Sequence, residues 1–175
     1  MKKVLLLAGF AGMVAANASA INIAPYIGLD ATYSTIDADT ATNISNKNWA
    51  GAIVLGGRTD RFGLEGYFEN SLREHETGMK TRNRKFGIDA LAFQPFGCSG
   101  KWEGVASAGL TANRIRAHKN GLSHNDNGYG ERLGAGLQYN VTEKLAVRAM
   151  YHYNWIHHSV VNNANEITLG IRYSF

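Results

Sequence analysis

The chain of 175 residues contains a single cysteine, Cys98, and only two prolines, Pro25 and Pro95. One cysteine excludes an internal disulfide framework and any zinc or iron–sulfur site held by several cysteines. The net charge of +4 is too small to indicate nucleic-acid binding by itself. Hydrophobic residues make up 45% of the chain and charged residues 18%, which excludes a disordered protein.

The N-terminus has the three parts of a secretory signal peptide. Lys2 and Lys3 form a cationic start, residues 4–16 are apolar, and Ala18-Ser19-Ala20 fits the small-x-small rule for cleavage. The apolar run is shorter than the ~20 residues that a membrane-spanning helix needs, and no later segment is apolar enough for one. We therefore predict an exported protein with a signal peptide at 1–20 and one mature domain at 21–175.

The mature chain alternates between apolar and small or polar residues, which is the period of a β-strand with two different faces. The clearest case is the C-terminal segment, where Ile167, Leu169, Ile171, Tyr173 and Phe175 share one face. Eight such segments are predicted: 27–34, 48–58, 62–73, 83–94, 102–116, 129–140, 145–155 and 167–175.

Short and long connections alternate along the chain. Residues 59–61, 95–101 and 141–144 form short connections, and residues 35–47, 74–82, 117–128 and 156–165 form long polar ones. An even number of antiparallel strands, with short turns at one rim and long loops at the other, is typical of an up-and-down transmembrane β-barrel. Both prolines fall at strand ends, where no ladder donor is lost. The predicted fold is therefore an all-β, eight-stranded antiparallel barrel.

Alternation alone leaves open which face points inward. A secreted lipocalin-like barrel would turn its apolar face inward and its charges outward to water. The mid-strand polar face here carries mostly small residues, which suit the filled lumen of a narrow eight-stranded barrel. Its few charges have both signs, and buried charges must be paired. We predict an interior ion-pair network made of Glu65, Glu69, Asp89, Glu103, Arg132, Arg148 and Arg172.

Aromatic residues gather near both ends of the predicted strands, as expected at the two interfaces of a bilayer. Trp49 and Trp155 belong to the long-loop rim, with Tyr33, Phe68, Tyr151 and Tyr153 nearby. The short-turn rim holds Phe62, Trp102, Tyr139, Tyr173 and Phe175.

The segments 24–29, 133–139 and 170–175, together with the signal peptide, resemble the eight-stranded outer-membrane β-barrel family. That family includes the barrel domain of outer membrane protein A and the opacity-type surface proteins. The resemblance covers essentially the whole mature chain and implies the outer membrane of a Gram-negative bacterium. It also implies that Tyr173 and the terminal Phe175 form a signal for the barrel assembly machinery. It carries no single activity, since family members have structural, adhesive or host-interaction roles.

We expect a non-enzymatic monomer that supports envelope integrity and offers surface loops for adhesion or partner binding, without cofactor, metal or nucleic acid. Two alternatives remain at this stage. One is a narrow pore. The other is a lipid A-modifying hydrolase, because the His-x-Ser segment is similar to that of lipid A deacylases. That similarity would make His157 the base, Ser159 the nucleophile and Glu166 the orienting acid, although Val160 departs from the deacylase pattern.

A basic cluster is predicted at the outer rim of two neighbouring strands. Its members share the outward parity of segments 83–94 and 102–116, so strand pairing would bring them side by side. Arginine binds phosphate well through its planar fork. We therefore predict that lipopolysaccharide contacts Lys80, Arg82, Arg84, Arg114 and Arg116.

Overall fold

The computed structural model describes the backbone of residues 23–37, 46–71, 74–76, 79–119, 122–157 and 163–175. Side chains are described for residues 23–35, 48–71, 84–114, 128–155 and 163–175. Among these residues, no helix is both long and apolar enough to cross a bilayer. The strands are β1 (Ala24–Asp37), β2 (Asn46–Arg58), β3 (Phe62–Ser71), β4 (Glu74–Glu76), β5 (Met79–Phe96), β6 (Trp102–Lys119), β7 (Leu122–Asn140), β8 (Leu145–His157) and β9 (Asn163–Ser174).

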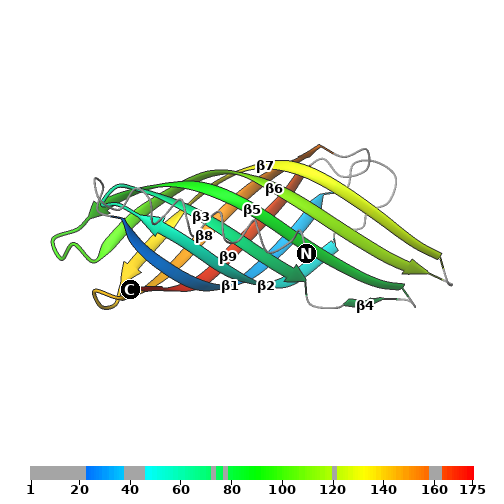
Figure 1. Ribbon diagram of the computed structural model, residues 1–175, viewed down its shortest axis with the longest axis horizontal. Coiled ribbons are helices and arrows are strands. Elements are labelled where there is room, and N and C mark those ends of the chain that lie inside the picture. Colours follow the sequence, from blue (N-terminus) through cyan, green and yellow to red (C-terminus); the bar gives the residue numbers. More distant parts are fainter. Residues whose placement is uncertain (1–22, 38–45, 72–73, 77–78, 120–121, 158–162) are drawn as a thin grey trace, which may run out of the picture.

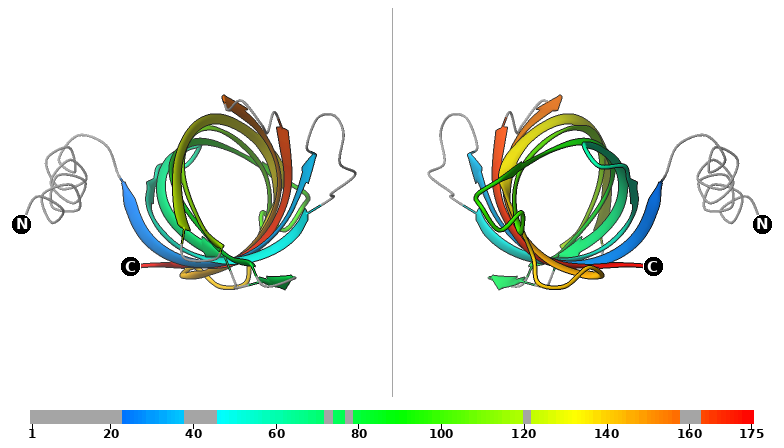
Figure 2. Two further views of the ribbon diagram at one scale, coloured as in Figure 1. Left: turned by 90° about the vertical axis from the view of Figure 1, so that its right-hand side faces the viewer. Right: turned by 90° about the vertical axis from the view of Figure 1, so that its left-hand side faces the viewer.

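Eight of these strands close into a barrel (Figures 1 and 2). Sequence neighbours pair antiparallel, β1 pairs with β9, and β3 pairs with β5 to complete the ring. The short β4 pairs only with the beginning of β5. The predicted eight-stranded antiparallel barrel is confirmed, and its eight ring strands each have a neighbour on both sides, which removes the exposed edges that invite association.

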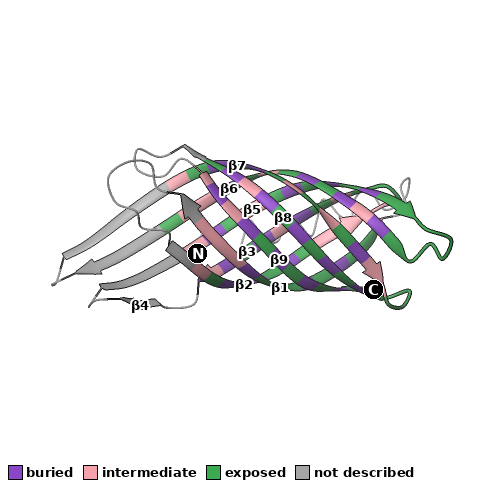
Figure 3. Ribbon diagram, turned by 180° about the vertical axis from the view of Figure 1, so that it is seen from behind, coloured by how far each residue is buried: buried purple, intermediate pink, exposed green. Residues whose placement is uncertain are grey.

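Buried and exposed residues alternate along every ring strand, so the wall has an inner and an outer face (Figure 3). Large apolar side chains point outward: Leu29 is 55% exposed and Leu169 is 58% exposed. Charged side chains point inward: Asp89 is 1% exposed and Arg148 is 2% exposed. A water-soluble barrel would show the opposite orientation. The lipocalin-like alternative is therefore wrong for this chain.

Several strands are longer than predicted, and two of the expected polar loops, 74–82 and 117–128, are mostly strand. β5 begins at Met79, β6 runs to Lys119 and β7 begins at Leu122, so these three strands occupy all of 79–82 and most of 117–128 (Figure 1). At ~3.3 Å per residue, β7 is far longer than the ~9–11 residues that span a bilayer. Outside a bilayer both faces of a strand meet water, so the sequence there needs no apolar alternation and gives no period-two signal. We call these extensions of β5, β6 and β7, which are residues 79–82, 117–119 and 122–128, the arm.

The opposite rim is formed by short turns, by the beginning of β1 and by the end of β9. β1 and β9 meet there, with Tyr26 opposite Ser174. The β5–β6 turn contains Gly97 and Gly100 with φ values of 80° and 64°, a left-handed conformation that favours glycine. We call this rim the turn side of the barrel.

Aromatic side chains form two girdles on the outer face. On the turn side, the Phe96, Trp102 and Tyr139 rings stack in sequence, with centroids 6.4 and 4.8 Å apart. On the arm side, the ring pairs have centroids 4.7–5.0 Å apart and are Tyr33–Trp49, Phe68–Phe86 and Tyr153–Trp155.

Candidate functional site

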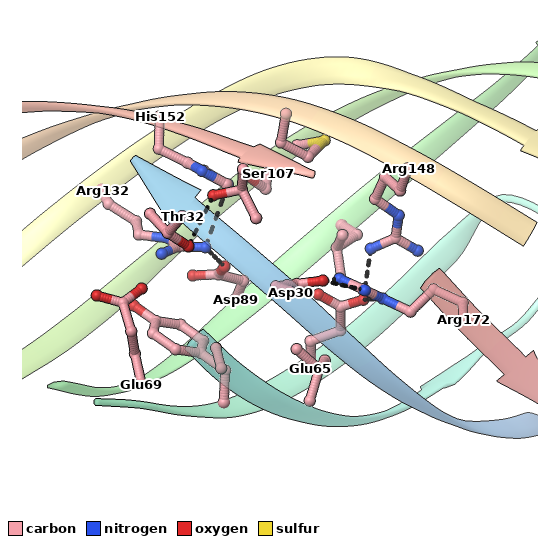
Figure 4. Close-up of a pocket in the computed structure, with 16 residues that line it drawn as sticks. Asp30, Thr32, Glu65, Glu69, Asp89, Ser107, Arg132, Arg148, His152 and Arg172 are labelled. Carbon is pink, nitrogen blue, oxygen red and sulfur yellow. Dashed lines mark hydrogen bonds and ion pairs between the residues drawn. The ribbon is translucent and has the colours of Figure 1, made fainter. Parts of the chain in front are cut away.

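All seven side chains predicted for the interior network lie inside the barrel, and each is at most 8% exposed. They belong to two clusters, separated along the barrel axis (Figure 4). The turn-side cluster contains Glu65, Glu103, Arg148 and Arg172 and is joined by Asp30 and Arg58. The arm-side cluster contains Glu69, Asp89 and Arg132 and is joined by Lys85 and Glu166.

Glu65 is the centre of the turn-side cluster. Its Oε1 accepts hydrogen bonds from the Tyr26 hydroxyl at 2.8 Å and from Arg172 Nε at 3.2 Å, and it also pairs with Arg148 Nη1. Arg172 turns its remaining nitrogens to Asp30, with Nη2 3.0 Å from Oδ2. Each buried guanidinium thus has a carboxylate partner, which is the condition for a charge to stay inside a protein.

The same cluster extends to the turn-side rim. Arg58 forms a bidentate pair with Glu103 at 2.8 and 2.9 Å, and Gln138 donates to Glu103 at 2.8 Å. Phe93 lies between two guanidinium groups, with Arg58 Cζ 4.0 Å and Arg148 Cζ 5.4 Å from its ring centroid. Three cations balance three carboxylates here, so the lumen at this level is filled by paired charges and an aromatic ring.

The arm-side cluster has one more carboxylate than it has permanent cations. Lys85 Nζ lies 3.1 Å from Glu69 and also pairs with Glu166. Arg132 Nη2 donates to Asp89 Oδ2 at 2.6 Å, and Arg132 Nη1 lies 3.7 Å from Glu166. The Arg132 guanidinium also stacks on Tyr67, 4.3 Å from the ring centroid.

The sequence prediction missed four charged members of these clusters: Asp30, Arg58, Lys85 and Glu166. Alternation along the strand could have identified Asp30, because it lies between Gly28 and Thr32 on the face already assigned to the interior. Arg58 ends the segment whose alternation is least regular. Lys85 has the parity of Asp89, but it precedes the mid-strand region where inward charges were sought.

The Arg172–Asp30 pair needs glycines beside it. A Cβ on Gly28 would lie 2.6 Å from Arg172 Cδ, and a Cβ on Gly170 would lie 2.7 Å from Arg172 Nη1. Both distances are too short for ordinary contacts. Glycine at these inward positions therefore gives the long guanidinium side chain room against the wall.

The outer face of β5 and β6 carries facing basic residues near the arm. Arg84 lies directly opposite Arg114, and Arg82 lies directly opposite Arg116. Arg84 is half-buried and Arg114 is exposed, and both belong to the outward-facing set. The side chains of Lys80, Arg82 and Arg116 lie outside the described residues. We call the Arg84–Arg114 pair the arginine rung.

The rung lies just beyond the arm-side aromatic girdle. Phe86 comes two residues after Arg84 in β5, which is ~6.6 Å along a strand towards the turn side. The next residues in the same cross-strand row are Asn70 and Asn127, so no carboxylate is in register with the two arginines. Like charges directly opposite each other destabilise a sheet unless an anion compensates them.

Comparison with known proteins decides the family. A protein-family model described as outer membrane protein beta-barrel domain matches residues 4–175. The chain belongs to this family. Its exposed apolar wall is therefore a lipid-facing wall, and the outer membrane is confirmed as its location.

Solved structures share the fold of this outer-membrane barrel at low sequence identity. Neisserial surface protein A is 21% identical, with a TM-score of 0.74 over 86% of this chain and 97% of that one. Ail, the attachment invasion locus protein of Yersinia pestis, is 16% identical, with a TM-score of 0.63 over 87% and 98%. The N-terminal barrel domain of Pseudomonas aeruginosa OprF is 18% identical, with a TM-score of 0.59 over 86% and 97%. A search of curated proteins finds no match.

Of the hydrolase residues, the structure describes the side chain of Glu166 alone. Glu166 lies inside the outer-membrane barrel opposite His152, and its carboxylate is held by Lys85 and Arg132. His157 is the last residue of β8, but its side chain and the whole of Ser159 lie outside the described residues. Glu166 is therefore an ion-pair partner within the arm-side cluster.

The C-terminal residues Tyr173 and Phe175 lie on the outer face, where their rings meet edge to face at 5.7 Å. Both are exposed, Phe175 by 73%. The end of β9 thus presents two aromatic rings to the lipid at the turn side.

Proposed function

We propose that this barrel is a non-enzymatic, monomeric envelope protein that anchors the arm at the cell surface. The observation that carries the proposal is the division of the wall: apolar side chains face the lipid, paired charges fill the lumen, and β5–β7 continue past the barrel. Among the residues that the structure describes, ion pairs and Phe93 fill the lumen, which disfavours the narrow pore. Tyr173 and Phe175 fit an assembly signal because they are accessible at the end of the last strand.

Gel mobility and conductance test this proposal together. The unboiled protein should migrate faster than the boiled protein on a detergent gel, because a closed barrel stays compact until it is heated. In a planar bilayer the same preparation should give no steady conductance. Extraction of the protein from membranes as soluble material, or regular channel steps, would contradict the proposal.

We further propose that the arginine rung binds a lipid phosphate, and that lipopolysaccharide is the lipid. A phosphate between Arg84 and Arg114 would relieve the repulsion between two facing cations and accept charge-assisted hydrogen bonds from both. The position just beyond the aromatic girdle corresponds to the headgroup level of a bilayer. Lys80, Arg82 and Arg116 follow along the same two strands, and we propose them as further contacts for the anionic core of that lipid.

Arg84→Glu/Arg114→Glu should abolish most of the stabilisation that lipopolysaccharide gives to the barrel. Each lost charge-assisted hydrogen bond is worth ~1.5–3 kcal/mol. Melting temperatures are compared in vesicles with and without lipopolysaccharide. Arg61→Glu, an exposed arginine in the β2–β3 turn, is the control and should keep the wild-type shift. An equal shift in all three proteins would rule out the rung as the phosphate site.

The arm is our proposed site for surface partners. A solved structure of Ail from Yersinia pestis is a complex with the heparin analogue sucrose octasulfate, so a barrel of this fold can bind a polyanion. In the present chain, the arm is the part of the wall that extends beyond the bilayer and is free to meet such a partner.

A further inference from the structure

A small cavity lies on the barrel axis between the two interior clusters (Figure 4). Its volume is about 20 Å³. A cavity needs ~10–15 Å³ to hold one water molecule. The cavity therefore has room for one water molecule. Among its lining residues are Tyr67, Asp89, Ser107, Arg132 and His152 from the arm side, and Asp30, Glu65 and Arg148 from the turn side.

Five of the lining side chains carry a buried polar atom with no hydrogen-bond partner among the described protein atoms. These atoms are Tyr67 Oη, Asp89 Oδ1, Ser107 Oγ, Arg132 Nε and His152 Nδ1. All five residues are more than nine-tenths buried. A buried polar atom without a partner costs ~1–3 kcal/mol, so five of them around one cavity point to a shared ligand.

The hydrogen bond between Arg132 and His152 determines which of these atoms donate. Arg132 Nη2 lies 3.1 Å from His152 Nε2. A guanidinium group has only donors, so His152 Nε2 accepts and the ring proton is on Nδ1. His152 Nδ1–H and Arg132 Nε–H are therefore donors, Asp89 Oδ1 is an acceptor, and the Ser107 and Tyr67 hydroxyls can be either.

Two inward-facing glycines bring these groups close together. A Cβ on Gly134 would lie 2.5 Å from Ser107 Oγ and 2.9 Å from His152 Nε2, and Asp89 Oδ1 occupies the corresponding position at Gly109. Gly109 is two residues after Ser107 and directly opposite both Asp89 and Arg132. The absence of side chains at these two positions leaves room on the inner wall for Ser107, for the Nε2 edge of His152 and for Asp89.

We propose that this cavity binds one ordered water molecule, which accepts from His152 Nδ1–H and donates to Asp89 Oδ1 and Ser107 Oγ. A cation would be repelled by the N–H donors of His152 and Arg132, and an anion by the Asp89 carboxylate. Water can accept and donate at one site, and buried waters make about three hydrogen bonds. The water also stabilises Asp89 in the cluster that has three carboxylates against two cations.

Nuclear magnetic resonance of the ¹⁵N-labelled protein in detergent micelles tests this proposal. The His152 ring should be the Nδ1–H tautomer, and its Nδ1–H proton should show a cross-peak to a bound water. Ser107→Val fills the cavity with methyl groups and removes a partner, so the water cross-peak should disappear. Ala106→Val, which makes a similar change on the adjacent outward-facing residue, is the control and should retain the cross-peak.

The wild-type spectrum is decisive even if Ser107→Val does not fold. An Nε2–H tautomer at His152, or a wild-type His152 without water contact, would overturn the proposal. Persistence of the cross-peak in a folded Ser107→Val protein would also overturn it, since the water would then lie elsewhere.

Discussion

Glu65→Gln should lower the free energy of unfolding by ~3–5 kcal/mol, the usual cost of removing one partner from a buried ion pair. Glu65 Oε1 receives three donors, from Tyr26, Arg148 and Arg172. Glutamine preserves the shape but removes the negative charge, so two buried guanidinium groups lose their shared carboxylate. Arg172 retains Asp30, whereas Arg148 retains only the neutral Gln138. The effect should therefore arise mainly from Arg148.

Chemical unfolding in detergent micelles, followed by tryptophan fluorescence and gel mobility, measures this change. Glu103→Gln is a matched control because its partner Arg58 has a side chain that is 19% exposed. Water can solvate that arginine, so the loss there should be ~1 kcal/mol. Equal losses for the two variants would show that burial does not determine the strength of these pairs.

Leu169→Arg should destabilise the inserted barrel by ~2–4 kcal/mol, the cost of an arginine at the midplane of the lipid-facing wall. Leu169 lies on the outer face of β9, opposite Ala31 on one side and Ala149 on the other. In water the same substitution on a 58% exposed side chain would cost almost nothing. The stability of this variant therefore shows whether the outer face of β9 meets lipid or water.

Folding into lipid vesicles across a urea series measures the effect. Gln94→Arg is the control, because Gln94 lies on the outward face of β5 two residues from the end of the strand. Near the interface an arginine costs only ~0–1 kcal/mol. A similar cost at both positions would mean that Leu169 does not lie at the centre of a bilayer.

Much of the fold could be predicted from the chain alone. Alternation is a local property, so segments such as 167–175 and the short connections between segments indicate strands and hairpins without knowledge of their neighbours. The boundaries were less accurate at the arm, where 117–128 was expected as a loop and is mostly strand. Pairing of β6 with β7 in one long hairpin decides that region. A strand that meets water on both faces leaves no alternating pattern in the sequence.

The sequence by itself determined which residues share a face, because parity along a strand is independent of how the barrel closes. It could not determine which acid meets which base. Glu65 and Arg172 are 107 residues apart and meet only because the ring of eight strands closes and brings inward side chains together across the lumen. Glu166 is a second example. Its place shortly after His157 and Ser159 in the sequence suggested a hydrolase, but in the barrel it pairs with Lys85, 81 residues away. Tertiary structure decided these partners because the stagger of the strands around the barrel sets the height of each charge.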